Sequence, residues 1–249
     1  MARFTWGDLV STFTRSFMVQ GSWNYRTMIG SGFAFAMIPA LRRIFQGDSK
    51  ALDASLRRHL ELFNAHPYLS NVALGAVARL EAEGADEDSV RRFKMAVRGP
   101  LGGLGDSLVW ASWLPAVSMF ALALYWLGVP GWLAVMSFLV VYNAGHLGLR
   151  VWGFRAGLAE GRGVARSLSR AGLGAWVERI RGLNALLLGV LVGSVLAGNG
   201  GLAEGGPVLA AFGVLGFVAG DVLGHRVWRP TAVTVVVAVV LLAAWGWAS

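Results

Sequence analysis

Three short segments of the chain combine polar side chains with glycine or aromatic neighbours. The first is Gln20-Gly21-Ser22-Trp23-Asn24-Tyr25. The amides of Gln20 and Asn24 can both donate to and accept from hydroxyl groups, and Trp23 offers a flat face to the C–H side of a sugar ring. The same residues also suit an Asn/Gly turn with a tryptophan anchored at a membrane interface, and the pattern leaves both interpretations open.

The second segment, RRHLELFNAHP at 57–67, holds two histidines seven residues apart. On one helix they would share a face, and Pro67 is expected to end that helix. Histidines that bind one zinc ion on a helix lie four residues apart, whereas seven residues span about 10 Å. We therefore expect no metal site. We expect hydrogen-bonding roles, structural or toward a substrate, for His59, Glu61, Asn64 and His66.

The third segment is Gly99-Pro100-Leu101-Gly102-Gly103-Leu104-Gly105-Asp106-Ser107, immediately before a long apolar run. It lacks the Gly-Lys-Ser/Thr of a phosphate-binding loop. Its four glycines permit unusual backbone angles and close approach to another surface. An acid at the edge of a membrane span is costly unless it is paired or used, so Asp106 is a candidate functional residue. The alternative is that Asp106 caps the following helix.

Composition places these segments in a membrane protein. Hydrophobic residues make up 55% of the 249 residues and charged residues 14%, against about 25% charged in a soluble domain. Residues 108–127 carry no charge over a length that matches a hydrocarbon core, and 231–248 form a second such run. The net charge of +8 lies mostly beside apolar runs, which favours anionic lipid over nucleic acid as the partner. The chain has no cysteine, so disulfides are excluded.

The chain divides near residue 107. Residues 1–107 form an N-terminal region with helical patterns too short or too polar to span, and residues 108–249 form a transmembrane region. Candidate spans lie at about 108–127, 130–149, 183–199, 207–223 and 231–248. The runs at 183–199 and 207–223 are of marginal length and form either a tight pair of spans or a re-entrant hairpin. The linker at 150–182 carries seven arginines against two glutamates, which predicts a cytoplasmic location. Five spans then place residues 1–107 inside and Ser249 outside.

Two elements of the N-terminal region are expected to be unusual. Residues 5–19 predict an amphipathic helix with a Thr5–Asp8 capping box and an apolar stripe of Leu9, Phe13 and Phe17. It packs on the protein core or lies in the lipid interface with Arg15 toward the headgroups. Residues 29–41 are apolar but too short to span, and with Pro39 near their end they predict a re-entrant segment. The fold class is an all-α membrane protein, a polytopic helical bundle.

A fourth segment, Asn143 to Gly157, places Asn143, His146 and Arg150 on one helix face, where they line a protein interface or reach the cytoplasmic surface. Together the series RSFMVQGSWNY at 15–25, RRHLELFNAHP at 57–67, GPLGGLGDSL at 99–108 and NAGHLGLRVWGFRAG at 143–157 resembles the IID family of mannose/fructose/sorbose-type sugar phosphotransferase systems. The departures are Leu62 for a usual Phe, Ala65 for a usual Thr and Gly103 for a usual Ala.

The resemblance implies a transport subunit of a bacterial plasma membrane. It implies a hetero-oligomer in which a IIC protein joins the chain to translocate a mannose-type hexose, while cytoplasmic IIA and IIB components carry the phosphate. Family IID chains are not phosphorylated, so neither catalysis nor a cofactor is expected. The residues expected near the sugar path or in its supporting network are Gln20, Trp23, Asn24, His59, Glu61, Asn64, His66 and Asp106. The alternative is a structural or regulatory subunit without efficient transport.

Overall fold

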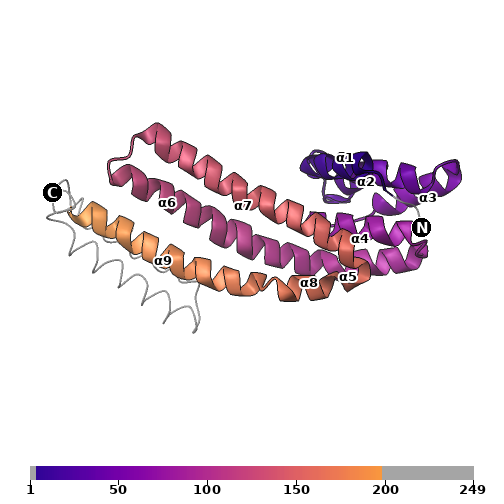
Figure 1. Ribbon diagram of the computed structural model, residues 1–249. Coiled ribbons are helices and arrows are strands. Elements are labelled where there is room, and N and C mark those ends of the chain that lie inside the picture. Colours follow the sequence, from indigo (N-terminus) through magenta and orange to yellow (C-terminus); the bar gives the residue numbers. More distant parts are fainter. Residues whose placement is uncertain (1–3, 198–249) are drawn as a thin grey trace. The chain divides into compact units, whose positions relative to one another are not determined.

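The computed structural model describes residues 4–197, with side chains as far as Val192, and the regular elements in this range are helices. Figure 1 labels the α-helices in chain order. Their bounds are α1 Trp6–Arg15, α2 Gly30–Ile44, α3 Ser49–His59, α4 Ser70–Ala82, α5 Glu87–Gly105, α6 Leu114–Trp126, α7 Gly131–Glu160, α8 Val164–Arg170 and α9 Leu173–Ala197. Shorter helices are η1 Ser16–Met18, η2 Asp106–Trp113 and η3 Gly161–Gly163.

The chain packs as two compact units. The first unit combines Met1–Asp106 with Gly145–Leu173, so it takes in α1 to α5, the second half of α7, and α8. Within the described residues, the second unit is built from Ser107–Ala144 and the chain from Gly174 to Ala197.

Helix α1 begins at the predicted capping box. The Thr5 hydroxyl accepts a hydrogen bond from the Asp8 N–H (3.2 Å), and the Asp8 carboxylate accepts one from the Thr5 N–H (2.8 Å), which confirms this prediction. Asp8 also pairs with Arg43 of α2 at 2.8 Å. The guanidinium of Arg15 lies 4.9 Å from the centre of the Phe35 ring, so it too is directed toward α2.

Helices α2 and α4 form the centre of the first unit, with side chains such as Phe33, Met37 and Leu74 fully buried. The apolar stretch predicted to be re-entrant is part of a longer helix, because α2 continues through Pro39 to Ile44. Packing explains the continuation, since tertiary burial of a helix face outweighs the local cost of one proline.

Close contact between α4 and α7 depends on glycine. A Cβ added to Gly157 would lie 2.1 Å from the Val72 carbonyl oxygen, and one added to Gly75 would lie 2.2 Å from the Phe154 carbonyl oxygen. Only a hydrogen atom fits at these positions, so the two backbones lie in contact. Small residues at the contact between two helices are typical of helix pairs in membrane proteins.

Two helical stretches, the second interrupted by a turn at residues 171–172, are long and apolar enough to cross a membrane. They are Glu87–Trp126 and Gly131–Val192, whose most apolar windows have mean hydropathies of 1.6 and 1.4. In the second unit, the side-chain amide of Asn184 donates to the Ser112 carbonyl oxygen at 3.0 Å, which links α9 to η2. The predicted spans 207–223 and 231–248, and the location of Ser249, fall outside the described residues.

Candidate functional site

The segment between α3 and α4 carries the second motif and lies next to residues that closely follow the first motif. Helix α3 ends at His59, so the prediction of one helix carrying both His59 and His66 is wrong. The chain instead runs alongside residues 27–29. The Phe63 N–H donates to the Thr27 carbonyl oxygen (3.2 Å), and the Ile29 N–H donates to the Phe63 carbonyl oxygen (3.1 Å).

The third motif packs on the same segment. A Cβ on Gly105 would lie 2.2 Å from the His66 Cβ and 2.4 Å from its Cγ, so glycine is required where α5 crosses His66. This confirms the predicted close approach of the backbone. The four glycines, however, lie within α5 and do not use the unusual backbone angles that glycine permits, because none of them has a positive φ.

Asp106 lies inside a continuous helix, and the alternative that it caps a new helix is therefore wrong. It begins η2, a π-helix that joins α5 to α6. Within this π-helix the Ser112 hydroxyl donates to the Ser107 carbonyl oxygen at 2.7 Å. Such insertions disturb the regular hydrogen-bond ladder and occur frequently at functional sites. The exposed Asp106 side chain has no hydrogen bond or ion pair within the described part of the chain.

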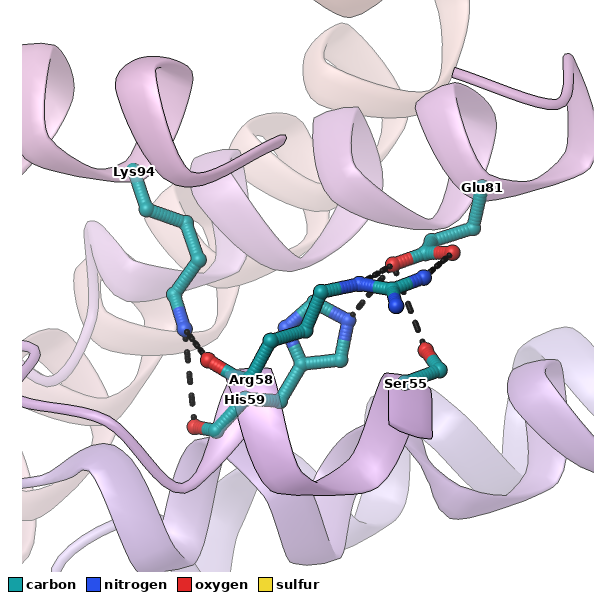
Figure 2. A network of polar contacts seen from close by, with 5 residues as sticks. All are labelled: Ser55, Arg58, His59, Glu81 and Lys94. Atoms are coloured by element: carbon teal, nitrogen blue, oxygen red, sulfur yellow. Dashed lines mark hydrogen bonds and ion pairs between the residues drawn. The ribbon is translucent and has the colours of Figure 1, made fainter. Parts of the chain in front are cut away.

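Behind these segments lies a buried polar network, shown in Figure 2. Glu81 of α4 accepts from both Nε and Nη2 of Arg58, at 2.9 and 2.5 Å. The Glu81 carboxylate also forms a hydrogen bond with Nε2 of His59 at 2.9 Å and accepts one from the Ser55 hydroxyl at 3.3 Å. The ammonium of Lys94, from α5, donates to the carbonyl oxygens of Arg58 (3.0 Å) and His59 (3.5 Å). The network therefore joins α3, α4 and α5.

Burial decides the charge states in this network. It lowers the pKa of His59 to about 4, so at neutral pH the ring is uncharged and its Nε2–H donates to Glu81. Burial alone raises the pKa of Glu81, but the hydrogen bonds from His59 and Arg58 outweigh it and hold that pKa below its usual value. Glu81 is thus ionised.

His66 belongs to a second cluster, which includes the fourth motif. Its Nδ1 accepts from the Tyr68 N–H at 3.2 Å, and burial lowers the pKa of the ring to about 4. Tyr68 stacks on His146 with ring centres 4.0 Å apart. Arg150 donates to His146 at 2.7 Å and to the Ser16 carbonyl oxygen at 3.0 Å. Arg150 is buried, which agrees with the predicted protein interface and not with the cytoplasmic surface.

Sequence reasoning missed the partners that define these two clusters. Arg58, Glu81 and Lys94 look like ordinary charges of solvated helix faces, and Tyr68 lies just beyond the second motif. One signal was available: Glu81 follows a run of ten α4 residues, 71–80, in which Arg79 is the only other charge. A charge at the end of an apolar helix is expected to have a buried partner.

The exposed candidates fall into two groups. Both polar atoms of the Asn24 side chain have hydrogen-bond partners within the local turn. Its Nδ2 donates to Ser22 and Thr27, and its Oδ1 accepts from the N–H groups of Arg26 and Thr27. Glu61 is paired with Arg91 at 2.6 Å. By contrast, Gln20, Asn64 and Asp106 are exposed and have no side-chain hydrogen bond among residues 4–192.

Trp23 is also exposed and packs edge-on against Tyr25, with ring centres 4.8 Å apart. The chemistry of the exposed set is therefore that of two amides, one carboxylate and an aromatic face. Such groups can hydrogen-bond to hydroxyls and stack on a sugar ring. All of them lie on motif segments of the first unit.

Comparison with known proteins identifies relatives of the chain. The chain is 31% identical to the mannose-specific EIID component of Escherichia coli (strain K12) over 76% of this chain and 68% of the relative. It is 32% identical to the sorbose-specific EIID component of Klebsiella pneumoniae, over 76% of this chain and 70% of the relative. The chain is 29% identical to the fructose permease IID component of Bacillus subtilis (strain 168), over 76% of this chain and 70% of the relative.

Among solved structures, the fold is similar to a chain in the cryo-EM structure of the mannose transporter ManYZ in complex with microcin E492. The TM-score is 0.61 and the sequence identity 26%, covering 99% of this chain and 98% of that chain. Residues 3–201 match the family described as the PTS system mannose/fructose/sorbose family IID component. The chain belongs to this family and is a membrane subunit of a sugar-transporting phosphotransferase system.

Proposed function

We propose that the chain pairs with a IIC subunit in a bacterial plasma membrane and that the pair translocates a mannose-type hexose. Cytoplasmic IIA and IIB components supply the phosphate, and IIB phosphorylates the sugar. Similarity to a chain of the ManYZ mannose transporter over nearly the whole length of both proteins supports this proposal. The chain itself contributes binding groups, and the phosphotransfer chemistry belongs to its partners.

The observation that carries the proposal is the set of unpaired polar side chains on the motif segments. Gln20, Asn64 and Asp106 are exposed and have no hydrogen-bond partner among the described residues. We assign these three, with Trp23, to the sugar path. Asn24, His59, Glu61 and His66 already have protein partners, so we assign them to the supporting network.

We further propose a polytopic helical bundle with the basic stretch 150–182 on the cytoplasmic side. In this arrangement α1 lies at the lipid interface. The stretch 29–41 within α2 enters the membrane region without crossing it. The burial of α2 residues such as Gly32, Phe33 and Ala36 supports this, because a segment too short to span is tolerated at membrane depth only where protein surrounds it.

Replacement of Asp106 by Asn tests the transport role. Asn keeps the size and one acceptor but removes the charge. Hydrogen bonds to a charged group contribute about 1.5–3 kcal/mol, which corresponds to roughly ten- to a hundred-fold in binding. We expect Asp106→Asn to assemble normally with IIC and to reduce hexose uptake by at least about ten-fold.

The matched control is Asp88→Asn, an exposed acid in the first turn of the same helix, which should leave uptake unchanged. Assembly is measured by co-purification with a tagged IIC subunit, and uptake with radiolabelled hexose in cells that express all four components. Wild-type uptake in Asp106→Asn would remove Asp106 from the sugar path. Failure to co-purify would instead indicate a structural role.

A further inference from the structure

An apolar groove in the first unit lies between α1 and the last turns of α7. Its volume is about 410 Å³. Its walls include Trp6, Val10 and Phe13 of α1 and Phe154, Arg155 and Leu158 of α7. Every lining residue except Arg155 is apolar.

The groove exposes apolar side chains of α1 on both sides of Leu9 and Phe13. Phe13 packs against Phe154, with ring centres 5.9 Å apart, and both residues line the groove. Trp6 and Val10 remain 80% and 41% exposed, so the described part of the chain covers the apolar face of α1 only in part. An amphipathic helix of a membrane protein with an open apolar face requires an apolar occupant.

The charge at the groove identifies the kind of occupant. Arg155 is exposed and forms no ion pair or hydrogen bond within residues 4–192. Asp8, the only acid of α1, does not line the groove and is paired with Arg43 at 2.8 Å. The groove therefore offers an apolar floor and one unneutralised guanidinium, whose fork of N–H donors matches a phosphate.

We propose that this groove binds an anionic phospholipid, with an acyl chain against α1 and the phosphodiester on Arg155. The proposal goes beyond sugar transport and involves none of the residues assigned to the sugar path. A partner helix or the part of this chain beyond the described residues would also cover an apolar groove. Neither accounts for an unpaired arginine at its edge as a lipid phosphate does.

The absence of cysteine from the sequence permits a direct test on the full chain assembled with its IIC partner in nanodiscs. A fluorophore on Val10→Cys reports contact with acyl chains. Quenching by spin-labelled phosphatidylglycerol is compared with quenching by spin-labelled phosphatidylcholine at equal content. One basic residue near an anionic surface contributes about 1 kcal/mol, so we expect about five-fold preference for phosphatidylglycerol.

Two further variants separate a specific site from general attraction to a basic protein. Arg155→Gln should abolish the preference, while Arg155→Lys should keep most of it. Arg162→Gln, a control that removes another exposed arginine seven residues further on, should leave the preference intact. A fluorophore on Ala54→Cys of α3, which does not line the groove, should show no preference.

Three outcomes would overturn the proposal. Equal quenching by the two lipids would exclude a site for anionic headgroups. An equal loss of preference in Arg155→Gln and Arg162→Gln would indicate diffuse attraction. Absence of quenching by either lipid would mean that protein covers the groove. Because the readout requires no sugar, it is independent of the hexose uptake that tests the proposed function.

Discussion

At the scale of single residues, Glu81 is the centre of the buried polar network of the first unit. Its carboxylate accepts from Arg58, His59 and Ser55, and its side chain is 1% exposed. A buried ion pair adds little when it is intact, because desolvation offsets the attraction between its charges. Its removal is costly, since the remaining charge is left buried and uncompensated.

We therefore expect Glu81→Gln to destabilise the protein by about 3–5 kcal/mol, because Arg58 would lose its counter-charge inside the protein. The control is Glu83→Gln, which breaks the partly exposed pair with Arg79 and should cost about 0–1 kcal/mol. Thermal unfolding of the complex measures both. Equal melting temperatures for the two variants would contradict a structural role for the network.

The same network predicts how stability depends on pH. His59 has a folded pKa of about 4, below its usual 6.5, so the folded state binds fewer protons than the unfolded state between these values. The contribution of His59 is complete above pH 6.5 and is lost as the pH falls toward 4. The upper limit of this loss is about 3 kcal/mol. His66 and Glu81 have lowered pKa values and shift stability in the same direction.

Denaturant titrations of the complex at pH 7.5 and at pH 5 measure this dependence. These two values lie on either side of the usual histidine pKa of 6.5, each about one pH unit or more away from it. His59→Gln keeps a donor for Glu81 but cannot titrate, so its stability should vary less with pH than that of the wild-type protein. Wild-type stability that is equal at both pH values would show that His59 is not neutral in the folded protein.

At the scale of elements, glycine decides how the helices meet. Gly105 and Gly103 lie two residues apart in α5, but their surroundings differ. A Cβ on Gly105 would overlap His66, whereas a Cβ on Gly103 would meet nothing within 4 Å. The two positions therefore separate the packing role of glycine from its low helix propensity.

We expect Gly105→Ala to destabilise the protein by about 1–3 kcal/mol, since α5 must move away from His66. Gly103→Ala should stabilise it by up to about 1 kcal/mol, because alanine is the better helix former at an exposed position. Both variants can be compared by thermal unfolding. If both variants changed the melting temperature by the same amount in the same direction, His66 would be able to move away from residue 105 without a loss of stability.

At the scale of the whole molecule, the orientation in the membrane remains a prediction from charge. Arginines within 150–182 predict a cytoplasmic location for α8. A single cysteine at Ala165→Cys should react with a membrane-impermeant maleimide only after the cells are permeabilised. A cysteine at Val129→Cys, in the turn before α7, should react in intact cells. Reaction of residue 165 from outside would reverse the proposed topology.

The sequence was sufficient for features that depend on local pattern. The capping box of α1 follows from Thr5 and Asp8, and the helical, membrane-type fold follows from the apolar runs. The family follows from four ordered motifs. These signals lie within a few residues of one another, or depend only on residue type and order.

Features set by tertiary packing could not be predicted in this way. The Gly99–Gly105 stretch has poor helix propensity, but it is helical because packing against His66 outweighs that cost. The Arg58–Glu81 pair joins residues 23 apart, and the link from Arg150 to Ser16 joins residues 134 apart. Nothing in the local pattern selects one partner among many. The roles of Gln20, Asn64 and Asp106 stay predictions until uptake is measured.

The discontinuity of the first unit has a consequence for biosynthesis. Helix α4 leaves the ribosome before residues 107–144, and only then does the stretch Gly145–Leu173 follow, whose Phe154 and Gly157 cover α4. Until that stretch emerges, the nascent unit exposes the face of α4 that the finished protein buries. Completion of the first unit is therefore coupled to synthesis of the hairpin that interrupts it, and chains arrested before residue 145 should be preferred substrates for chaperones and membrane proteases.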